Sequence, residues 1–262
     1  MTLQSTNEIT SEQPMIRAWV IAAAHETERA AHIQLLAAQL PGLEQMEAIY
    51  PTRQKVPFLS RLIALTKQRT GTALNKGEIG VLLSNRAIWK RIVKEARSES
   101  EHFLILESDS VVNDLVMLHQ QYPSVEKDYD LFFWGAWLGH AQILRSTKKK
   151  VQLSTPHPSP EDAPTTYAIG TPFYKTICSG YGYSLNKKAA AYLLKRSNKI
   201  AYPVDEFKRY ANPHDLRWGT ILPEIISQGK GTTTIGHSAN PLLEKIWISL
   251  LDIRNAVICF FN

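Results

Sequence analysis

Two carboxylates directly follow the most clearly defined strand that the sequence predicts. Residues 103–106 (FLIL) are fully apolar, and Glu107 and Asp109 come next, two positions apart. Side chains two residues apart in an extended segment point the same way, so both carboxylates can face one point. Hard oxygen ligands at the carboxyl end of a strand suit Mg²⁺ or Mn²⁺, together with a substrate's phosphates. The pair is a candidate metal site, and an ordinary polar turn is the alternative.

The elements that must position this pair are those of an α/β domain. Strand, helix and strand are predicted over residues 16–24, 25–40 and 46–50. The most regular helical patterns cover residues 76–96 and 187–196. Short apolar strands that alternate with helices predict a sheet covered by helices.

Composition excludes several classes of protein. Hydrophobic residues make up 44% of the chain and charged residues 21%, which excludes disorder of the whole chain. The two cysteines, Cys178 and Cys259, lie far apart, so a disulfide scaffold is excluded and a reducing cytoplasm is expected. The net charge is +6, yet residues 101–142 carry seven acidic residues against one lysine. This pattern predicts an anionic partner without choosing between nucleic acid, an anionic membrane and a phosphorylated small molecule.

The chain divides into one domain and two flanking segments. Residues 1–14 are polar and are predicted to be a disordered leader, and the domain covers residues 15–241. Within it, residues 146–172 hold a lysine triplet and five prolines, which predicts a long surface loop or a lid. Residues 242–262 are expected to form a C-terminal amphipathic helix. No apolar stretch reaches the roughly 20 residues that cross a bilayer.

Four blocks of sequence occur in a particular order. They are residues 74–89 (LNKGEIGVLLSNRAIW), 104–111 (LILESDSV), 180–194 (GYGYSLNKKAAAYLL) and 203–205 (PVD). Together they resemble the blocks of glycosyltransferase family 25, which read approximately L-T-x-G-E-I-G-C-x-x-S-H-x-x-x-W, L-E-D-D, G-Y-x-x-S-x-x-x-A-x-x-L and P-x-D. That family includes bacterial lipooligosaccharide galactosyltransferases and collagen galactosyltransferases. The resemblance covers about residues 16–240.

The sequence departs from the family pattern at three places. Asn85 stands where the family has histidine, and Ser108 stands where it has the middle aspartate. Residues 22–24 (AAA) replace an Asn-Leu pair. The outer acids Glu107 and Asp109 remain, so a metal site is still expected. The lost histidine and aspartate leave open an altered donor or a catalytically inactive relative.

The resemblance implies a GT-A fold, with a mixed, mostly parallel central sheet flanked by helices. It implies inverting transfer of a hexose, galactose favoured, from a UDP-sugar to a hydroxyl group of a lipooligosaccharide or another glycan. The expected partners are a UDP-sugar donor and an oligosaccharide or lipid-linked glycan acceptor. The expected cofactor is Mn²⁺ or Mg²⁺, held by Glu107 and Asp109. His237 is the candidate third ligand, with His214 as a weaker one and polar surface as the alternative for both.

Inverting transfer needs a general base for the acceptor hydroxyl. The family motif points to Asp205 in this sequence. The alternative role for Asp205 is an N-cap of the helix that follows. Asp215 and Glu224 are reserve candidates.

Candidates for donor contact lie at two helix starts. Glu78, Ser84 and Arg86 belong to the helix predicted from residue 76, and helix N-termini favour anions. Glu78 has an alternative role in a capping box with Asn75. Arg29 matches an arginine that the family has after its first strand, and its alternative role is to tie down its own helix.

The acceptor candidates are aromatic residues beside glycines. Trp134 at a strand end, and Gly180 with Tyr181, offer sugar-stacking faces and close backbone approach. The alternative is a β-bulge with core aromatics.

Rival functions remain. A sequence pI of about 9.2 permits a nucleic-acid-binding module. No zinc spacing or recognition motif supports it, so no nucleic acid is expected. The second rival is an inactive relative that binds a sugar nucleotide or a glycan. A cytoplasmic protein is expected, with peripheral contact to the anionic inner face of the membrane through the basic C-terminal half and the apolar tail.

Overall fold

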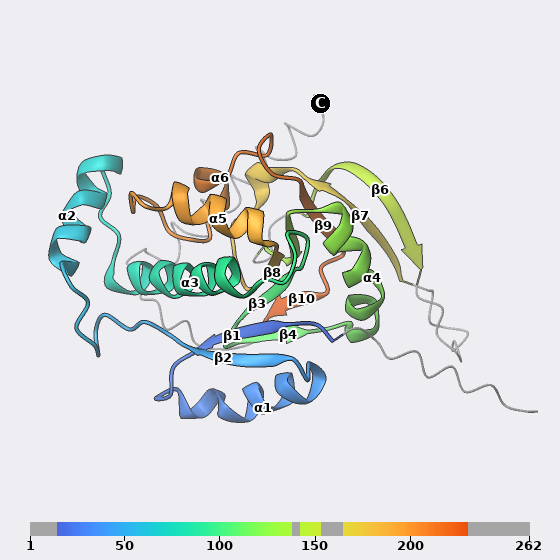
Figure 1. Ribbon diagram of the computed structural model, residues 1–262, viewed down its shortest axis with the longest axis horizontal. Helices are drawn as coiled ribbons and strands as arrows, with labels where there is room; N and C mark the ends of the chain where they lie inside the picture. The colour runs from blue at the N-terminus through green and yellow to red at the C-terminus, as the bar shows by residue number, and fades with distance from the viewer. Residues whose placement is uncertain (1–14, 138–141, 153–164, 230–262) are drawn as a thin grey trace, which may run out of the picture.

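The computed structural model describes residues 15–137, 142–152 and 165–229 (Figure 1). The predicted leader, the predicted C-terminal helix and His237 lie outside this part of the chain. No helix among the described residues has the length and apolar character needed to cross a membrane.

Strands and helices alternate through most of the described chain. The strands are Ala18–Ala22 (β1), Leu43–Glu47 (β2), Phe103–Glu107 (β3), Ser110–Val112 (β4), Leu131–Gly135 (β5), Leu144–Gln152 (β6), Thr166–Pro172 (β7), Gly182–Leu185 (β8), Trp218–Leu222 (β9) and Ile226–Gln228 (β10). The α-helices are Ala30–Gln39 (α1), Leu59–Thr70 (α2), Lys76–Glu95 (α3), Leu115–Asp128 (α4), Lys187–Arg196 (α5) and Phe207–Tyr210 (α6). Two 3₁₀ helices, Thr27–Arg29 (η1) and Tyr174–Thr176 (η2), complete the list.

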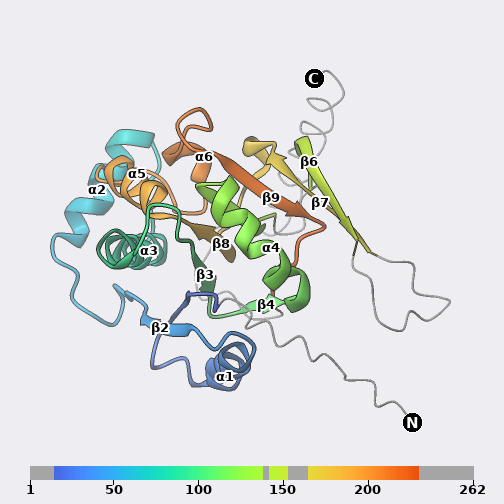
Figure 2. The same ribbon diagram turned by 45° about the vertical axis from the view of Figure 1, so that its right-hand side comes forward.

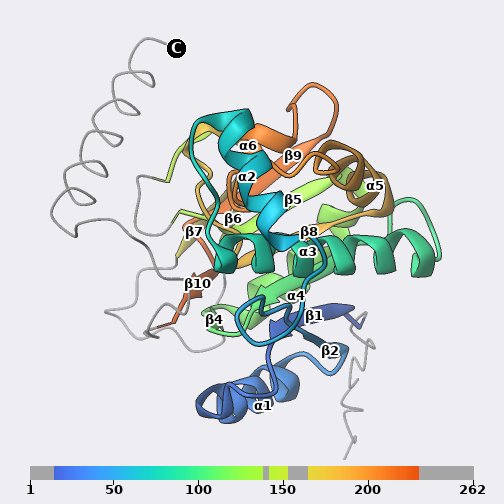
Figure 3. The same ribbon diagram turned by 90° about the vertical axis from the view of Figure 1, so that its left-hand side faces the viewer.

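Eight strands form one mixed sheet in the order β2-β1-β3-β8-β5-β9-β7-β6. Six of them run in the same direction, and β8 and β7 run the opposite way. The predicted mixed, mostly parallel sheet is confirmed. Strands β4 and β10 pair antiparallel in a separate small sheet beside the large one (Figure 3).

Helices cover both faces of the large sheet, as Figure 2 shows. On one face α3 and α5 bury residues such as Ile88 and Leu193 in the larger hydrophobic cluster. On the other face α1 and α4 bury residues such as Leu36 and Leu118 in the second cluster. The predicted α/β class is therefore confirmed, and the arrangement is that of a GT-A-like fold.

The central strands are apolar throughout because both of their faces are covered. Residues 103–106 of β3 are fully buried, as is most of β1. Strands of this kind read as continuous hydrophobic runs and not as alternating patterns. Because β1, β2 and β3 are parallel, their carboxyl ends meet at one edge of the sheet, where Ile21 pairs with both Met46 and Glu107. This register places the acidic turn after β3 beside the turn after β1.

Polar side chains fix where the long helices begin. The Asn75 side chain accepts a hydrogen bond from the Glu78 amide at 2.9 Å, and the Asn75 amide donates to Glu78 at 2.7 Å. This is a capping box, which satisfies two amides that have no partner inside the helix. Asn186 caps α5 by accepting a hydrogen bond from the Ala189 amide at 2.9 Å.

The prediction of one long loop over residues 146–172 is wrong at both ends. Strand β6 pairs antiparallel with β7, and the two form the outer edge of the sheet. Lysines 148–150 stand exposed on β6, and charged side chains on an edge strand prevent further strand pairing. A basic run is therefore compatible with a strand at this position. Residues 153–164, the part of this segment left for a lid, lie outside the described chain.

Candidate active site

A cleft opens at the carboxyl ends of β1, β2 and β3, beside the first turns of α3. Five segments of the chain form its wall. The lining residues are Ile21, Glu26, Arg29, Ala48, Ile49, Tyr50, Pro51, Thr52, Gly77, Val81, Ser84, Glu107, Ser108, Asp109 and Gln228. One half of this wall is apolar, and the other half contains three carboxylates and one guanidinium group.

Arg29 lies at the centre of the charged half. Its Nη2 is 3.8 Å from Asp109 Oδ2, and its Nη1 is 3.8 Å from Glu26 Oε1. The same Nη1 donates a hydrogen bond to Ser108 Oγ. The 3₁₀ turn after β1 and the turn after β3 are thus joined through one cation. The structure thus places Arg29, a predicted donor-contact residue, against the acidic turn.

Glu26 is a site residue that the sequence analysis missed. Its side chain is nearly buried, accepts a hydrogen bond from Tyr50 Oη at 2.7 Å and accepts another from the Ala23 amide at 3.2 Å. It connects the end of β1 to the loop after β2. The available signal was its position four residues after a buried strand and three residues before Arg29.

Glu107 carries the most perturbed carboxyl group of the cleft. Its pKa is raised to about 8, first by burial and then by the negative charges of Asp109 and Asp205, while Arg29 acts in the opposite direction. A raised pKa means that the charged form lacks compensation. The cleft therefore holds more negative charge than Arg29 balances.

Two carboxylate oxygens near Glu107 have unused hydrogen-bonding capacity. Asp109 Oδ1 and Asp205 Oδ1 are the buried carboxylate oxygens without a hydrogen-bond partner in the described residues. Buried polar atoms of this kind are rare in folded proteins and call for an explanation. A cation near Asp109 and a hydroxyl group near Asp205 would each provide one.

Asp205 lies just before α6, whose N-cap residue is Glu206. Burial, followed by the charges of Glu206 and Glu78, raises the pKa of Asp205 to about 6. The group is ionised at neutral pH and titrates close to it, which is what a general base requires. Its carboxylate influences Glu107, although Asp205 is not part of the cleft wall.

The other carboxylate and histidine candidates are less suited to the site. Asp215 is exposed and accepts a hydrogen bond from Tyr192 at 2.7 Å. His214 is also exposed. Among the described residues, no group of three or more His, Cys, Asp or Glu side chains is arranged to hold a metal ion. A cation at Asp109 would therefore need oxygen ligands from substrate and water, which is common for Mg²⁺.

The predicted donor residues of α3 have structural partners. Ser84 lines the cleft, but its hydroxyl donates to Gly80 O at 2.9 Å and accepts from the Ile49 amide at 2.8 Å. It thereby holds the loop after β2 against α3. Glu78 belongs to the capping box described above.

Arg86 is the clearest misplacement among the donor candidates. Its guanidinium group donates hydrogen bonds to Leu194 O, Ser197 Oγ and Asn198 Oδ1. It joins α3 to the C-terminal end of α5 and lies outside the cleft wall. Helical periodicity places Arg86 on a different face from the cleft residues Gly77, Val81 and Ser84, so the predicted donor contact is wrong.

The predicted acceptor platform is part of the core. Trp134 is fully buried, stacks on Tyr122 and donates its Nε1 hydrogen to Ser184 Oγ at 3.0 Å. Tyr181 is 1% exposed and donates to Glu224 Oε2 at 2.6 Å. Gly180 is buried as well. None of the three presents a face to a sugar here, so the alternative of core aromatics is the correct one.

Two of the positions that depart from the family pattern, Asn85 and Ser108, are hydrogen-bonded through their side chains. Asn85 is buried, and its Oδ1 accepts a hydrogen bond from Tyr183 Oη, which in turn accepts one from Trp89 Nε1 at 3.1 Å. Ser108 is buried against Arg29. Each of the two side chains therefore has hydrogen-bond partners within the protein.

The fold and the acidic turn define a GT-A-like protein, and a comparison with protein families agrees. The model described as glycosyltransferase family 25 (LPS biosynthesis protein) matches residues 15–208. This is well over half of the chain, and the chain belongs to glycosyltransferase family 25. Membership supports a glycosyltransferase role in lipopolysaccharide biosynthesis. A comparison with curated proteins finds no match.

Proposed function

We propose that this protein transfers a hexose, galactose favoured, from a UDP-sugar to a hydroxyl group of a lipopolysaccharide or lipooligosaccharide, with inversion at the anomeric carbon. The observation that carries the proposal is the convergence of Arg29, Glu107 and Asp109 at one sheet edge, with Asp205 close enough to raise the pKa of Glu107. Family membership supplies the class of reaction.

The cleft suits a nucleoside diphosphate in its two halves. The apolar half, with Ile21, Ile49 and Val81, offers surface for a base and a ribose. The charged half offers Arg29 to the diphosphate, because guanidinium groups bind phosphate oxygens in a bidentate manner. The diphosphate would displace Arg29 from part of its contact with Asp109.

A divalent cation, Mn²⁺ or Mg²⁺, fits the donor set of the acidic turn. Asp109 Oδ1 is buried and lacks a hydrogen-bond partner among the described residues. Glu107 is close enough for the charge of Asp109 to raise its pKa. Asp109, with Glu107 beside it, would hold the ion. Bound there, the ion would neutralise charge on the leaving diphosphate.

Asp205 is the proposed general base. Its carboxylate accepts the proton of the acceptor hydroxyl while the hydroxyl oxygen bonds to the anomeric carbon. The bond between that carbon and the diphosphate oxygen breaks, and UDP leaves with the electron pair. Attack from the face opposite the leaving group inverts the configuration.

The direct test is calorimetric titration with UDP, with and without Mn²⁺. We expect metal-dependent binding to the wild type and at least tenfold weaker binding to Asp109→Ala. Asp215→Ala is the matched control, because Asp215 is an exposed carboxylate away from the cleft, and its variant should bind like the wild type. Absence of UDP binding under every metal condition would overturn the proposal of a UDP-sugar donor.

One observation favours a second candidate, a sugar-nucleotide or glycan binder without turnover. Asn85 and Ser108 both occupy family motif positions, and both are engaged in local hydrogen bonds. Hydrolysis of UDP-galactose separates the candidates without knowledge of the acceptor. UDP binding that is tight and metal-dependent, with no UDP released from the sugar nucleotide over hours, would favour the binder.

A further inference from the structure

The segment between the cleft and α3 has an unusual charge pattern. Six cations and no acidic residue lie between Glu47 and Glu78. Four of the cations stand exposed around α2, namely Arg53, Lys55, Arg61 and Lys67. None of the four forms a salt bridge with another described residue. The segment is thus a concentrated and uncompensated positive surface.

Phe58 stands in the middle of these cations. Its side chain is 77% exposed, although phenylalanine is normally buried. Its backbone is left-handed, with φ 58° and ψ 20°, and it is the only non-glycine residue with positive φ in the described chain. For a bulky side chain this conformation is strained, and such strain concentrates at functional positions.

The exposure of Phe58 does not come from a loose helix. Leu59, Leu62 and Ile63, on the inner face of α2, pack against the main hydrophobic cluster. The buried Thr66 hydroxyl accepts a hydrogen bond from the Leu74 amide at 2.9 Å. Arg69 donates to Ile200 O at 2.7 Å. The helix is anchored at both ends, and Phe58 is held outward by it.

We propose that Phe58, with Arg53, Lys55, Arg61 and Lys67, forms a docking surface for an anionic lipid bilayer. We call these five residues the α2 surface. Basic side chains near an anionic bilayer are attracted to its headgroups, and an aromatic ring inserts at the interface. One exposed aromatic ring beside four exposed cations supplies both the insertion and the charge attraction that peripheral binding requires.

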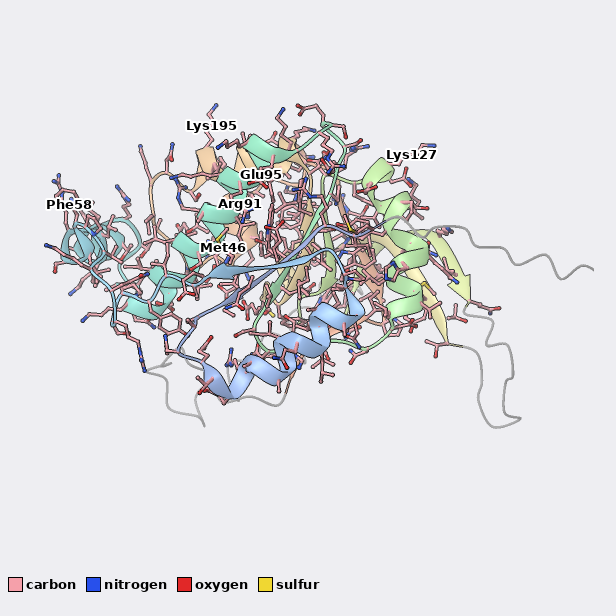
Figure 4. The ribbon with its side chains drawn as sticks, turned by 60° about the horizontal axis from the view of Figure 1, so that its bottom comes forward. Met46, Phe58, Arg91, Glu95, Lys127 and Lys195 are labelled. Atoms are coloured by element: carbon pink, nitrogen blue, oxygen red, sulfur yellow. The ribbon has the colours of Figure 1, made fainter. Side chains whose placement is uncertain are left out.

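The position of the α2 surface fits this occupant. Helix α2 lies at one end of the molecule, and Figure 4 shows Phe58 at its outer limit with Lys127 at the opposite end (Figures 1 and 4). The loop that leads into α2 contains Tyr50 and Thr52, which line the cleft. Docking through α2 therefore brings the cleft close to the bilayer. A nucleic acid is disfavoured, because single-strand binders use several stacked aromatics along a groove, and α2 presents one ring.

The test is vesicle flotation of the full chain without substrates, so its outcome does not depend on the proposed glycosyl transfer. Vesicles of phosphatidylcholine alone are compared with vesicles containing about one-third phosphatidylglycerol. We expect binding to the anionic vesicles only, weakened by raising NaCl from about 0.1 M to about 0.5 M. Inorganic phosphate at matched ionic strength should compete no better than NaCl.

Variants locate the contact on the protein. Phe58→Asn removes the ring and keeps a residue that tolerates the left-handed conformation, so we expect about tenfold weaker vesicle binding with unchanged or higher Tm. Phe58→Trp should retain binding. Arg61→Gln and Lys67→Gln should each weaken it about fivefold. Lys127→Gln with Lys150→Gln is the matched control at the other end of the molecule and should leave binding unchanged.

Several outcomes would overturn the proposal. They are no binding to anionic vesicles, equal binding to neutral vesicles, normal binding by Phe58→Asn, or equal weakening by the Lys127/Lys150 control pair. If the protein does not bind vesicles but binds an oligonucleotide in a way that depends on Phe58, the α2 surface is a nucleic-acid-binding surface instead.

Discussion

Two regions at the same edge of the sheet differ in how their polar atoms are used. In the acidic turn after β3, Asp109 Oδ1 is buried without a hydrogen-bond partner among the described residues, and the pKa of Glu107 is raised to about 8. The aromatic region around β5 and β8 pairs Trp134 with Ser184 and Tyr181 with Glu224. Sequence alone suggested ligand contact in both. In the first region a buried carboxylate oxygen has no hydrogen-bond partner among the described residues, whereas in the second the two candidates Trp134 and Tyr181 are both hydrogen-bonded within the protein.

A hydrogen-bond chain shows how Trp134 is paired inside the aromatic region. His102 Nε2 donates to Tyr129 O at 3.0 Å, so its Nδ1 is free to accept from Ser184 Oγ at 3.1 Å. The Ser184 hydroxyl in turn accepts from Trp134 Nε1. Each of these groups has a partner. The lesson is that aromatic residues beside glycine mark a binding face only when the fold leaves them exposed.

The largest effect should come from the carboxylate proposed to act as base. Asp205→Asn should lower kcat/KM for transfer about 10³-fold with a small change in Tm, because the amide cannot accept the proton of the acceptor hydroxyl. In the wild type the rate should fall tenfold per pH unit below about 6, where Asp205 becomes protonated. Steady-state kinetics over pH 5–8 measure both effects.

Asp215→Asn is the control for this prediction and should keep the wild-type rate. Loss of activity in Glu224→Gln but not in Asp205→Asn would assign the general base to Glu224. The aromatic region would then be part of the active site.

Trp134→Ala should destabilise the protein by about 3–5 kcal/mol, because it removes a fully buried indole and leaves a cavity. Denaturant unfolding measures the loss. UDP affinity of the folded fraction should be unchanged. A raised acceptor KM with an unaltered free energy of unfolding would restore Trp134 as a sugar platform.

His102 should make the aromatic region sensitive to acid. Burial lowers the pKa of His102 to about 4, below its value of 6.5 in the unfolded chain. The folded state thus binds the proton more weakly, so this stabilisation is complete above pH 6.5 and is lost as the pH falls towards 4. The loss amounts to about 3 kcal/mol. Unfolding free energies of the wild type and His102→Gln, measured from pH 7 to 4, should show this slope in the wild type alone.

Tyr181→Phe should have the smallest effect, about 1–2 kcal/mol of unfolding free energy. The change removes the hydroxyl that donates to Glu224 and accepts from the Trp137 amide at 3.1 Å. Thermal unfolding with a transfer assay separates the roles. A loss of transfer without a loss of stability would contradict the assignment of Tyr181 to the core.

Some elements could be predicted well because their signals are local. Helix α5 has the predicted bounds, and α3 ends within one residue of its predicted end. Helix α4 is not predicted, since Pro123 lies inside it and removes a backbone donor. Packing of Leu118, Tyr122 and Val125 against the second cluster outweighs that loss.

In the candidate site, too, the residues with a local sequence signal could be predicted, and those that depend on tertiary contacts could not. Glu107 and Asp109 could be identified because a buried strand and its following turn are contiguous in sequence. Glu26 was missed, because its partner Tyr50 comes close to it only when β1 and β2 pair. Arg86 was misplaced, because its partners lie more than 100 residues away, at the C-terminal end of α5 and just beyond it.

The sequence by itself determined the α/β class, the family and the acidic turn, since each depends on periodicity or on a short motif. The tertiary structure alone decided which polar groups face the cleft and which are enclosed. Burial and hydrogen-bond partners arise from contacts between distant segments. The same residue types can therefore complete a core at Tyr181 and leave a site open at Asp109.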